Sequence, residues 1–255
     1  MSGDIYVALL LPFGQEIAQE FYSDGEIVME QPTTRLYLVR HGATQLSAED
    51  RFAGAVDVGL SEEGKFQAGR LAERLANDSI AAVYCSPLMR TMQTATILAS
   101  LHQLPLLQEE GLREIHHGHW EGMRRADVEA QFPEEYAAWE EDPFTFAPQG
   151  GEAGVNVIAR ALPVIRKIVV EHRGQNVIVV SHKATLRLLI SSLLGFDARG
   201  YRDRLDQSPS CLNVVDFKDP VRARLMLFND TSHYSEAGLA LPKPADACLS
   251  KWWTR

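Results

Sequence analysis

Short apolar runs alternate along the chain with longer segments in which apolar residues recur every three or four positions. The runs are typical of buried β-strands, and the spaced pattern is typical of amphipathic helices. Residues 36–39 form one run, which stops at an Arg-His-Gly turn, residues 40–42. The clearest run covers residues 176–181. We expect further strands at residues 80–85, 105–107, 211–217 and 223–228.

Helical periodicity and capping residues predict the segments between these strands. Ser61 is a good N-cap, and two glutamates favour the first turn of the helix that follows it. A Ser-Pro pair at residues 86–87 predicts the start of a second helix. The pattern over residues 155–169 predicts a long helix, in which Pro163 introduces a kink or an early turn. Further helical segments are expected at residues 127–140 and 184–194.

Alternating strands and helices indicate an α/β layer protein. We expect an N-terminal extension, residues 1–33, that contains a possible short helix at residues 15–21 and adds an edge strand or covers a surface. The rest of the chain, residues 34–255, is expected to form one domain. Within it, residues 112–150 are rich in acidic and aromatic side chains and are predicted to form a cap-like insertion over one end of the sheet. Residues 230–255 are predicted to form a C-terminal tail.

The composition limits the class of protein. A 45% share of hydrophobic residues and a 23% share of charged residues are ordinary for a soluble globular domain. The formal net charge of -9 argues against general nucleic-acid binding, which needs a basic surface. The apolar run at residues 6–13 is too short to span a bilayer and follows no basic residue, so we expect neither a membrane segment nor a signal peptide. An odd number of cysteines without metal-binding spacing favours a reducing, cytoplasmic compartment: Cys85, Cys211 and Cys248.

Two histidines and two arginines lie where predicted strands end. Arg40 and His41 follow one strand, and His182 follows another. Arg90 lies in the first turn of the helix after a third strand. In an open α/β sheet, ligands bind at the carboxyl ends of the strands. Guanidinium groups match phosphate oxygens, a neutral imidazole is a nucleophile, and helix N-termini add N–H donors. These residues together predict a phosphate pocket.

Six short motifs follow one another over residues 35–229: LVRHGAT at 38–44, DVGLSEEG at 57–64, SPLMRTMQTA at 86–95, LREI at 112–115, GHWEG at 118–122 and VVSH at 179–182. Each motif alone is weak, but their order resembles that of the histidine phosphatase (phosphoglycerate mutase-like) superfamily. The resemblance implies a three-layer α/β/α fold with a central, mostly parallel sheet. It also implies that residues 34–255 are a histidine phosphatase domain.

The resemblance implies a role for each of five catalytic residues. His41 attacks phosphorus and carries the phosphoryl group, while Arg40, Arg90 and His182 hold the equatorial oxygens. Glu114 protonates the leaving oxygen and then deprotonates the water that hydrolyses the phosphohistidine. No metal and no other cofactor is implied.

The chain departs from the family pattern near the predicted pocket. In the polar loop at 45–60, Ser47 replaces a common asparagine but still has a hydroxyl to donate, and with Gly54 it is a candidate for substrate binding. Lys183 follows the second catalytic histidine, where a small residue is frequent, and either neutralises substrate charge or points into solvent. The GGEA segment at 150–153 lacks the serine of a related GGES element, which puts a helix cap in doubt.

Three histidines, His116, His117 and His119, lie close together, but without a suitably spaced carboxylate they are a weak metal site. His117 is a candidate contact for a substrate carboxylate, because a histidine at this position resembles the metal-independent phosphoserine phosphatases of the superfamily. The alternative is a hydrogen-bonded residue of the pocket wall.

The GHWEG segment resembles phosphatases more than mutases, so we expect a phosphatase that acts on a small phosphorylated metabolite. O-phospho-L-serine is the first candidate. Sugar phosphates, other metabolite phosphates, a phosphoglycerate mutase and a non-catalytic phospho-ligand-binding protein remain as alternatives. A homodimer is expected, because both ends of the chain are rich in apolar and aromatic residues.

Overall fold

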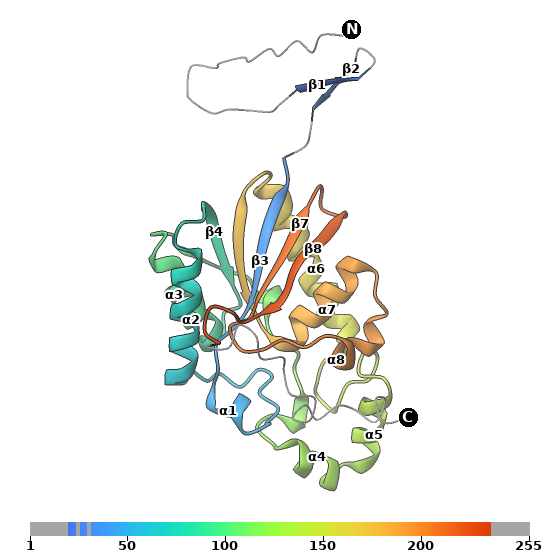
Figure 1. The fold of residues 1–255 in the computed structure, drawn as a ribbon. Coiled ribbons are helices and arrows are strands. Elements are labelled where there is room, and N and C mark those ends of the chain that lie inside the picture. The colour runs from blue at the N-terminus through green and yellow to red at the C-terminus, as the bar shows by residue number, and fades with distance from the viewer. Residues whose placement is uncertain (1–19, 24–25, 30–31, 236–255) are drawn as a thin grey trace.

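The computed structural model describes residues 20–23, 26–29 and 32–235 (Figure 1). Its centre is a six-stranded sheet in the order β5-β4-β6-β3-β7-β8. The first four strands in this order are parallel, and β7 and β8 run antiparallel to their neighbours. The fold is therefore the α/β fold with a mostly parallel sheet that the sequence predicts. The strands are β3 (Thr34–Arg40), β4 (Ile80–Cys85), β5 (Leu106–Gln108), β6 (Asn176–Ser181), β7 (Leu212–Phe217) and β8 (Ala223–Asp230).

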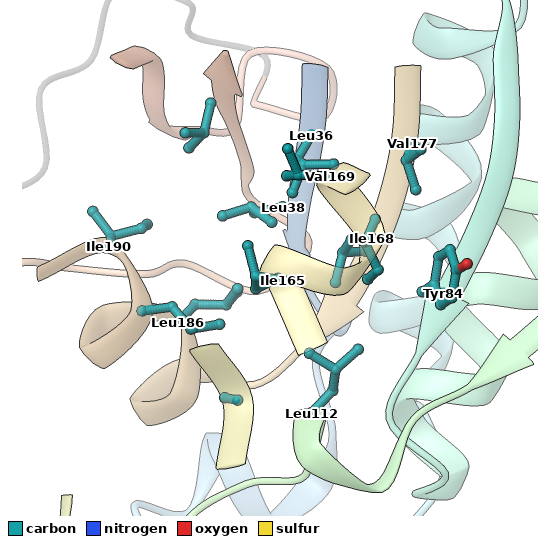
Figure 2. Packing of buried hydrophobic residues seen from close by; sticks show 14 of the residues in the cluster. Leu36, Leu38, Tyr84, Leu112, Ile165, Ile168, Val169, Val177, Leu186 and Ile190 are labelled. Atoms are coloured by element: carbon teal, nitrogen blue, oxygen red, sulfur yellow. The ribbon is translucent and has the colours of Figure 1, made fainter. Parts of the chain in front are cut away.

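Helices cover both faces of the sheet because its central strands are apolar on both sides. Along β3, Leu36 and Leu38 pack toward α6 (Gly154–Glu171) and α7 (Lys183–Leu194). Figure 2 shows these leucines beside Ile165 and Ile168 of α6. The alternating residues of β3, Tyr37 and Val39, pack on the other face toward α2 (Glu62–Leu75) and α3 (Met89–Ser100). A strand that is buried on both faces has a continuous run of apolar residues, and this run allowed β3 to be predicted from the sequence.

The carboxyl ends of the parallel strands are covered by short elements. The predicted cap, residues 112–150, is called the cap segment below. Its two helices, α4 (Arg125–Gln131) and α5 (Pro133–Glu141), lie beyond these strand ends in Figure 1. Aromatic residues of this segment, Trp120, Tyr136 and Trp139, form a small separate core together with Phe52. The remaining helices are α1 (Gln45–Ala48), α8 (Tyr201–Arg204) and the 3-10 turns Glu110–Leu112, Gly118–Trp120 and Ala198–Gly200.

Helix α3 begins later than the Ser-Pro pair predicts. Its first residue is Met89 and its N-cap is Leu88, which makes no side-chain cap. The Ser86 hydroxyl bonds to His182 instead of capping a helix. Asp57 accepts the N–H of Met89 at 2.6 Å and so replaces the missing cap from a distant loop. Helix α6 runs past its internal proline without an early turn, and its N-cap Ala153 makes no side-chain bond, as the lost serine implied.

The N-terminal extension differs from its prediction where it is described. Residues 20–21 belong to strand β1 (Glu20–Ser23), which pairs antiparallel with β2 (Glu26–Met29), so the predicted helix is wrong for these two residues. The other residues of that predicted helix, 15–19, lie outside the described residues, as do Cys248 and the C-terminal tail from residue 236. The β1–β2 pair is a sheet of its own, not an edge of the central sheet. Within the part of the chain that the structure describes, no helix is both long enough and apolar enough to cross a bilayer.

Candidate active site

A pocket of about 190 Å³ opens at the carboxyl ends of the parallel strands. All nine residues that the sequence assigned to catalysis or substrate binding lie near one another there, and all but His182 line the pocket directly. The ring of His182 lies edge-on to that of His41, with their centroids 5.2 Å apart. Segments far apart in the chain therefore meet at one site, as their positions at strand ends require.

His41 lies directly after β3, where its backbone N–H bonds to the carbonyl of Ser181 in β6. Its Nδ1 lies 2.8 Å from the carbonyl of Gly42. A carbonyl only accepts, so Nδ1 carries the ring proton and Nε2 has a free lone pair. Burial, with Arg40 and Arg90 nearby, holds the pKa of His41 well below 6.5. The side chain is therefore a neutral imidazole with one nitrogen ready to attack an electrophile.

Gly42 permits a close approach that holds this turn against helix α2. A Cβ on Gly42 would come within 3.0 Å of the backbone of Gly64, and a Cβ on Gly64 would clash with the backbone of Ala43. The N–H of Gly42 also donates to the Thr94 hydroxyl at 3.1 Å. This close contact thus requires glycine at both positions, Gly42 in one sequence motif and Gly64 in another.

The guanidinium groups of Arg40 and Arg90 are buried beside His41. Arg40 donates from one terminal nitrogen to the carbonyl of Gln207 at 2.6 Å, and its buried Nε has no hydrogen-bond partner among the described residues. Arg90 donates to the carbonyls of Val56 and Gly54, both at 2.7 Å. Burial lowers the pKa of both arginines, although a guanidinium stays protonated. Two desolvated cations at one site favour an anion between them.

His182 is held at both ring nitrogens. Its Nδ1 accepts from Nε of Arg90 at 3.2 Å, and its Nε2 lies 2.8 Å from the Ser86 hydroxyl. Since arginine only donates, Nε2 carries the proton of the neutral ring. Burial, Arg90 and His41 hold the pKa of His182 well below 6.5.

The Glu114 carboxylate is fixed at the start of helix α7. It accepts from the backbone N–H groups of Ala184 and Thr185 at 3.2 and 3.1 Å, and from the Thr185 hydroxyl at 3.1 Å. The N-terminal end of a helix favours negative charge, so it holds a carboxylate in one place. Glu114 and His41 line the same pocket, which puts a carboxylate and a neutral imidazole at one site.

The predicted substrate-binding residues all line the pocket, but they differ in how far their polar groups are already bonded within the protein. Ser47 donates its hydroxyl to the Thr44 carbonyl at 2.8 Å in the cap of α1, so that proton is engaged. Gly54 has a positive φ of 35° and directs its carbonyl to Arg90. The His117 ring packs edge-on against Phe52, and burial with nearby arginines lowers its pKa to about 3. Lys183 lines the pocket wall.

Sequence reasoning missed most of the outer wall of the pocket. Arg187 lies one helical turn after Lys183 on α7, and this spacing was the one available signal. Further missed side chains come from the loop before Gly54 and from helices α4, α5 and α8, which share no local pattern; they include Arg51, Phe52, Arg125, Trp139, Tyr201 and Arg202.

Glu121, in the GHWEG motif, ties two pocket loops together by accepting the N–H groups of Ala55 and His117 at 2.8 and 3.2 Å. His116 faces this same carboxylate at 3.6 Å, whereas His119 faces Glu135 at 3.3 Å. The neighbouring histidines thus point to different partners. Across the described ranges, no group of three or more His, Cys, Asp or Glu side chains is arranged to hold a metal ion.

Comparisons with known proteins agree with this geometry. The family model of the histidine phosphatase superfamily (branch 1) matches residues 36–231. The chain is 37% identical over 163 residues to phosphoserine phosphatase 1 of Hydrogenobacter thermophilus, covering 64% of this chain and 77% of that protein. It is 34% identical over 168 residues to the glucosyl-3-phosphoglycerate phosphatase of Mycolicibacterium vanbaalenii, covering 63% and 74%.

The fold is similar to that of YhfR from Bacillus stearothermophilus, with a TM-score of 0.74 and 32% sequence identity. The similarity covers 78% of this chain and 98% of that one. The chain therefore belongs to the histidine phosphatase superfamily and is a phosphatase of that superfamily, a hydrolase of phosphoric monoesters.

Proposed function

We propose that the protein hydrolyses a small phosphate monoester through a phosphohistidine on His41, without a metal, and that O-phospho-L-serine is the first candidate substrate. The observation that carries the proposal is the state of His41: a neutral ring whose Nδ1 proton is engaged and whose Nε2 is free, beside two buried guanidinium groups. This is the arrangement that a nucleophilic imidazole needs next to a phosphate dianion.

In the first step the Nε2 lone pair of His41 forms a bond to phosphorus as the bond from phosphorus to the leaving oxygen breaks. Glu114, protonated on one oxygen, gives that proton to the leaving oxygen, so an alcohol departs. In the second step water attacks phosphorus, Glu114 takes one proton from the water, and the bond to Nε2 breaks. Inorganic phosphate and the free imidazole result. Arg40 and Arg90 stabilise the charge on the phosphoryl oxygens in both steps.

The substrate is proposed to be compact and acidic. The pocket volume of about 190 Å³ is below the roughly 300 Å³ at which pockets for drug-sized ligands begin. A relative of this chain is named a phosphoserine phosphatase, which supports phosphoserine. His117 is proposed to donate one N–H to the substrate carboxylate as a neutral ring. Another relative is named a glucosyl-3-phosphoglycerate phosphatase, so a phosphorylated sugar acid is the second candidate.

The cap segment is proposed to close the pocket as part of a domain that begins at residue 34. We also infer a cytoplasmic location and a homodimer. Two buried free thiols, Cys85 and Cys211, support a reducing compartment. Exposed apolar side chains on neighbouring helices, Phe66 of α2 and Met89 of α3, support self-association. Light scattering after size-exclusion chromatography measures the oligomeric state directly.

The deciding experiment compares kcat/KM for phosphoserine, glucosyl-3-phosphoglycerate, 3-phosphoglycerate and sugar phosphates in wild type and His41→Ala, with EDTA present. We expect His41→Ala to lose at least about 10⁴-fold in activity and all acid-labile phosphoprotein, with an unchanged circular dichroism spectrum. His102→Ala, at a histidine outside the pocket lining, is the matched control. Activity that persists without His41 would overturn the nucleophile assignment, and equal rates for phosphoserine in His117→Phe would remove the proposed carboxylate contact.

A further inference from the structure

Two cations of helix α7 line the outer part of the pocket beyond the phosphate-binding arginines. Lys183 and Arg187 are four residues apart, so they lie on the same face of the helix. Both reach toward one carboxylate, with Lys183 Nζ 3.7 Å and an Arg187 terminal nitrogen 3.0 Å from Oδ1 of Asp206. The single carboxylate of Asp206 is therefore the partner of two cations.

Arg187 is far more desolvated than its partner carboxylate, whereas the Lys183 side chain is 43% exposed. The Arg187 side chain is only 12% exposed, and its buried Nε has no hydrogen-bond partner in the described part of the chain. The Asp206 side chain is 64% exposed. Burial, followed by repulsion from nearby arginines, lowers the pKa of Lys183 to about 8 and that of Arg187 to about 10. A second anion at this wall would compensate the excess positive charge.

Two other cations of the pocket wall, Arg202 and Arg125, contact the cap segment. The guanidinium of Arg202 lies over the Trp139 ring, 3.5 Å from its centroid, and bonds to Glu140 at 2.6 Å. Arg125 packs on the same ring at 5.3 Å. Both arginines thus attach helix α5 of the cap segment to the pocket wall, whereas the α7 pair contacts only Asp206 among the charged groups within ion-pair distance in the described ranges.

Helix α7 also places the pair on the side of the leaving group. The same first turn that carries Lys183 holds Glu114 through the N–H groups of Ala184 and Thr185. Since Glu114 is the proposed proton donor to the leaving oxygen, the carbon skeleton attached to that oxygen is expected on the α7 side of the pocket. A group on that skeleton is then within the part of the pocket that Lys183 and Arg187 line.

We propose that Lys183 and Arg187 form a second anion subsite, which binds an acidic group on the leaving alcohol while Arg40 and Arg90 hold the phosphate. The substrate class is then phosphate monoesters that carry a second acidic group, a carboxylate or a second phosphate, either of which matches the forked donors of arginine. The inference rests on the proposed function. It assigns the charged contact with the second acidic group to Lys183 and Arg187 of α7, because the ring of His117 is neutral.

The test measures kcat/KM of Arg187→Met and of Lys183→Met with four compounds. Phosphoserine and 3-phosphoglycerate carry a carboxylate, fructose 1,6-bisphosphate carries a second phosphate, and p-nitrophenyl phosphate has no second acidic group. We expect the loss with a doubly acidic substrate to exceed the loss with p-nitrophenyl phosphate by about tenfold to a hundredfold, mainly in KM. The conservative Arg187→Lys should recover part of this difference.

Arg166→Met, which removes an exposed arginine from helix α6, is the matched control and should alter none of the four rates. A selective loss with the carboxylates or with the bisphosphate supports the subsite and tells which acid it prefers. Equal losses with all four compounds would overturn the subsite but leave the phosphatase in place. If wild type hydrolyses none of the four, the proposed function itself has failed.

Discussion

The Nε of Arg90 donates a hydrogen bond to Nδ1 of His182 across 3.2 Å. Arginine has no acceptor, so this contact fixes the imidazole with its proton on Nε2, where it faces Ser86 at 2.8 Å. In this state the ring has no N–H to give to a phosphate oxygen. The role that the family resemblance implies for His182 therefore requires a second proton, on Nδ1.

Phosphate binding is expected to cause this second protonation of His182. Without ligand, burial and the charge of Arg90 hold the pKa of His182 well below 6.5. A dianion beside the ring raises the pKa, because opposite charge favours the protonated form. Inorganic phosphate at pH 8 should therefore convert Nδ1 of His182 into an N–H, visible in ¹⁵N spectra of histidine-labelled protein. The signal is assigned from His182→Asn. An unprotonated Nδ1 at saturating phosphate would show that Arg90 keeps its bond to the ring.

Glu114→Gln should slow hydrolysis according to the leaving group. The proposed acid is needed most for an alkyl phosphate such as phosphoserine, whose leaving oxygen is a strong base. The expected loss in kcat is about 10²- to 10⁴-fold with phosphoserine and much smaller with p-nitrophenyl phosphate, whose phenolate leaves without a proton. Glu110→Gln is the control, because that carboxylate pairs with Arg113 on the surface outside the pocket lining. Equal losses with both substrates would assign Glu114 a structural role.

The central strands and the position of Arg40, His41 and His182 at their carboxyl ends were predictable for the same physical reason. Strands β3 and β6 are buried on both faces, so they are continuous apolar runs, and Arg40, His41 and His182 follow them directly. The outer wall was not predictable, because Arg125 and Arg202 come from short helices far apart in the chain. The pairing of such residues depends on how the cap segment packs, and no local spacing records it.

Local signals also failed where a side chain has a distant partner. The Ser86 hydroxyl bonds to His182, so a residue type that normally caps a helix does not cap one here. The Ser47 hydroxyl shows the opposite case: its contacts are local, in the cap of α1, although it was expected to face substrate. Hydrogen-bonding side chains satisfy the nearest suitable partner, and sequence alone does not tell which one that is.

His117→Phe should flatten the dependence of stability on pH. The pKa of His117 is about 3 in the folded protein, because of burial and the nearby arginines, and about 6.5 in the unfolded chain. Between these values the unfolded state binds one more proton, so stability falls as pH falls. Removing the group should lessen this fall by about 1.4 kcal/mol for each pH unit between pH 6 and pH 4. Urea denaturation of both proteins over this range checks it, and parallel curves would contradict the lowered pKa of His117.

Gly42→Ala should lower both stability and activity, whereas Gly69→Ala should lower neither. A Cβ on Gly42 would press against the backbone of Gly64, which is not a flexible side-chain end that could move aside, so we expect a cost of about 1–3 kcal/mol. The same shift displaces the Gly42 carbonyl that holds Nδ1 of His41, so kcat should fall as well. Gly69 lies within α2 and has nothing within 4 Å of its Cβ position, so alanine there should stabilise by about 0.4–1 kcal/mol. Urea unfolding and kcat are measured for both variants. The comparison distinguishes a glycine that a tight turn requires from a glycine that is only part of a helix. Equal effects would show that the contact between Gly42 and Gly64 does not position the nucleophile.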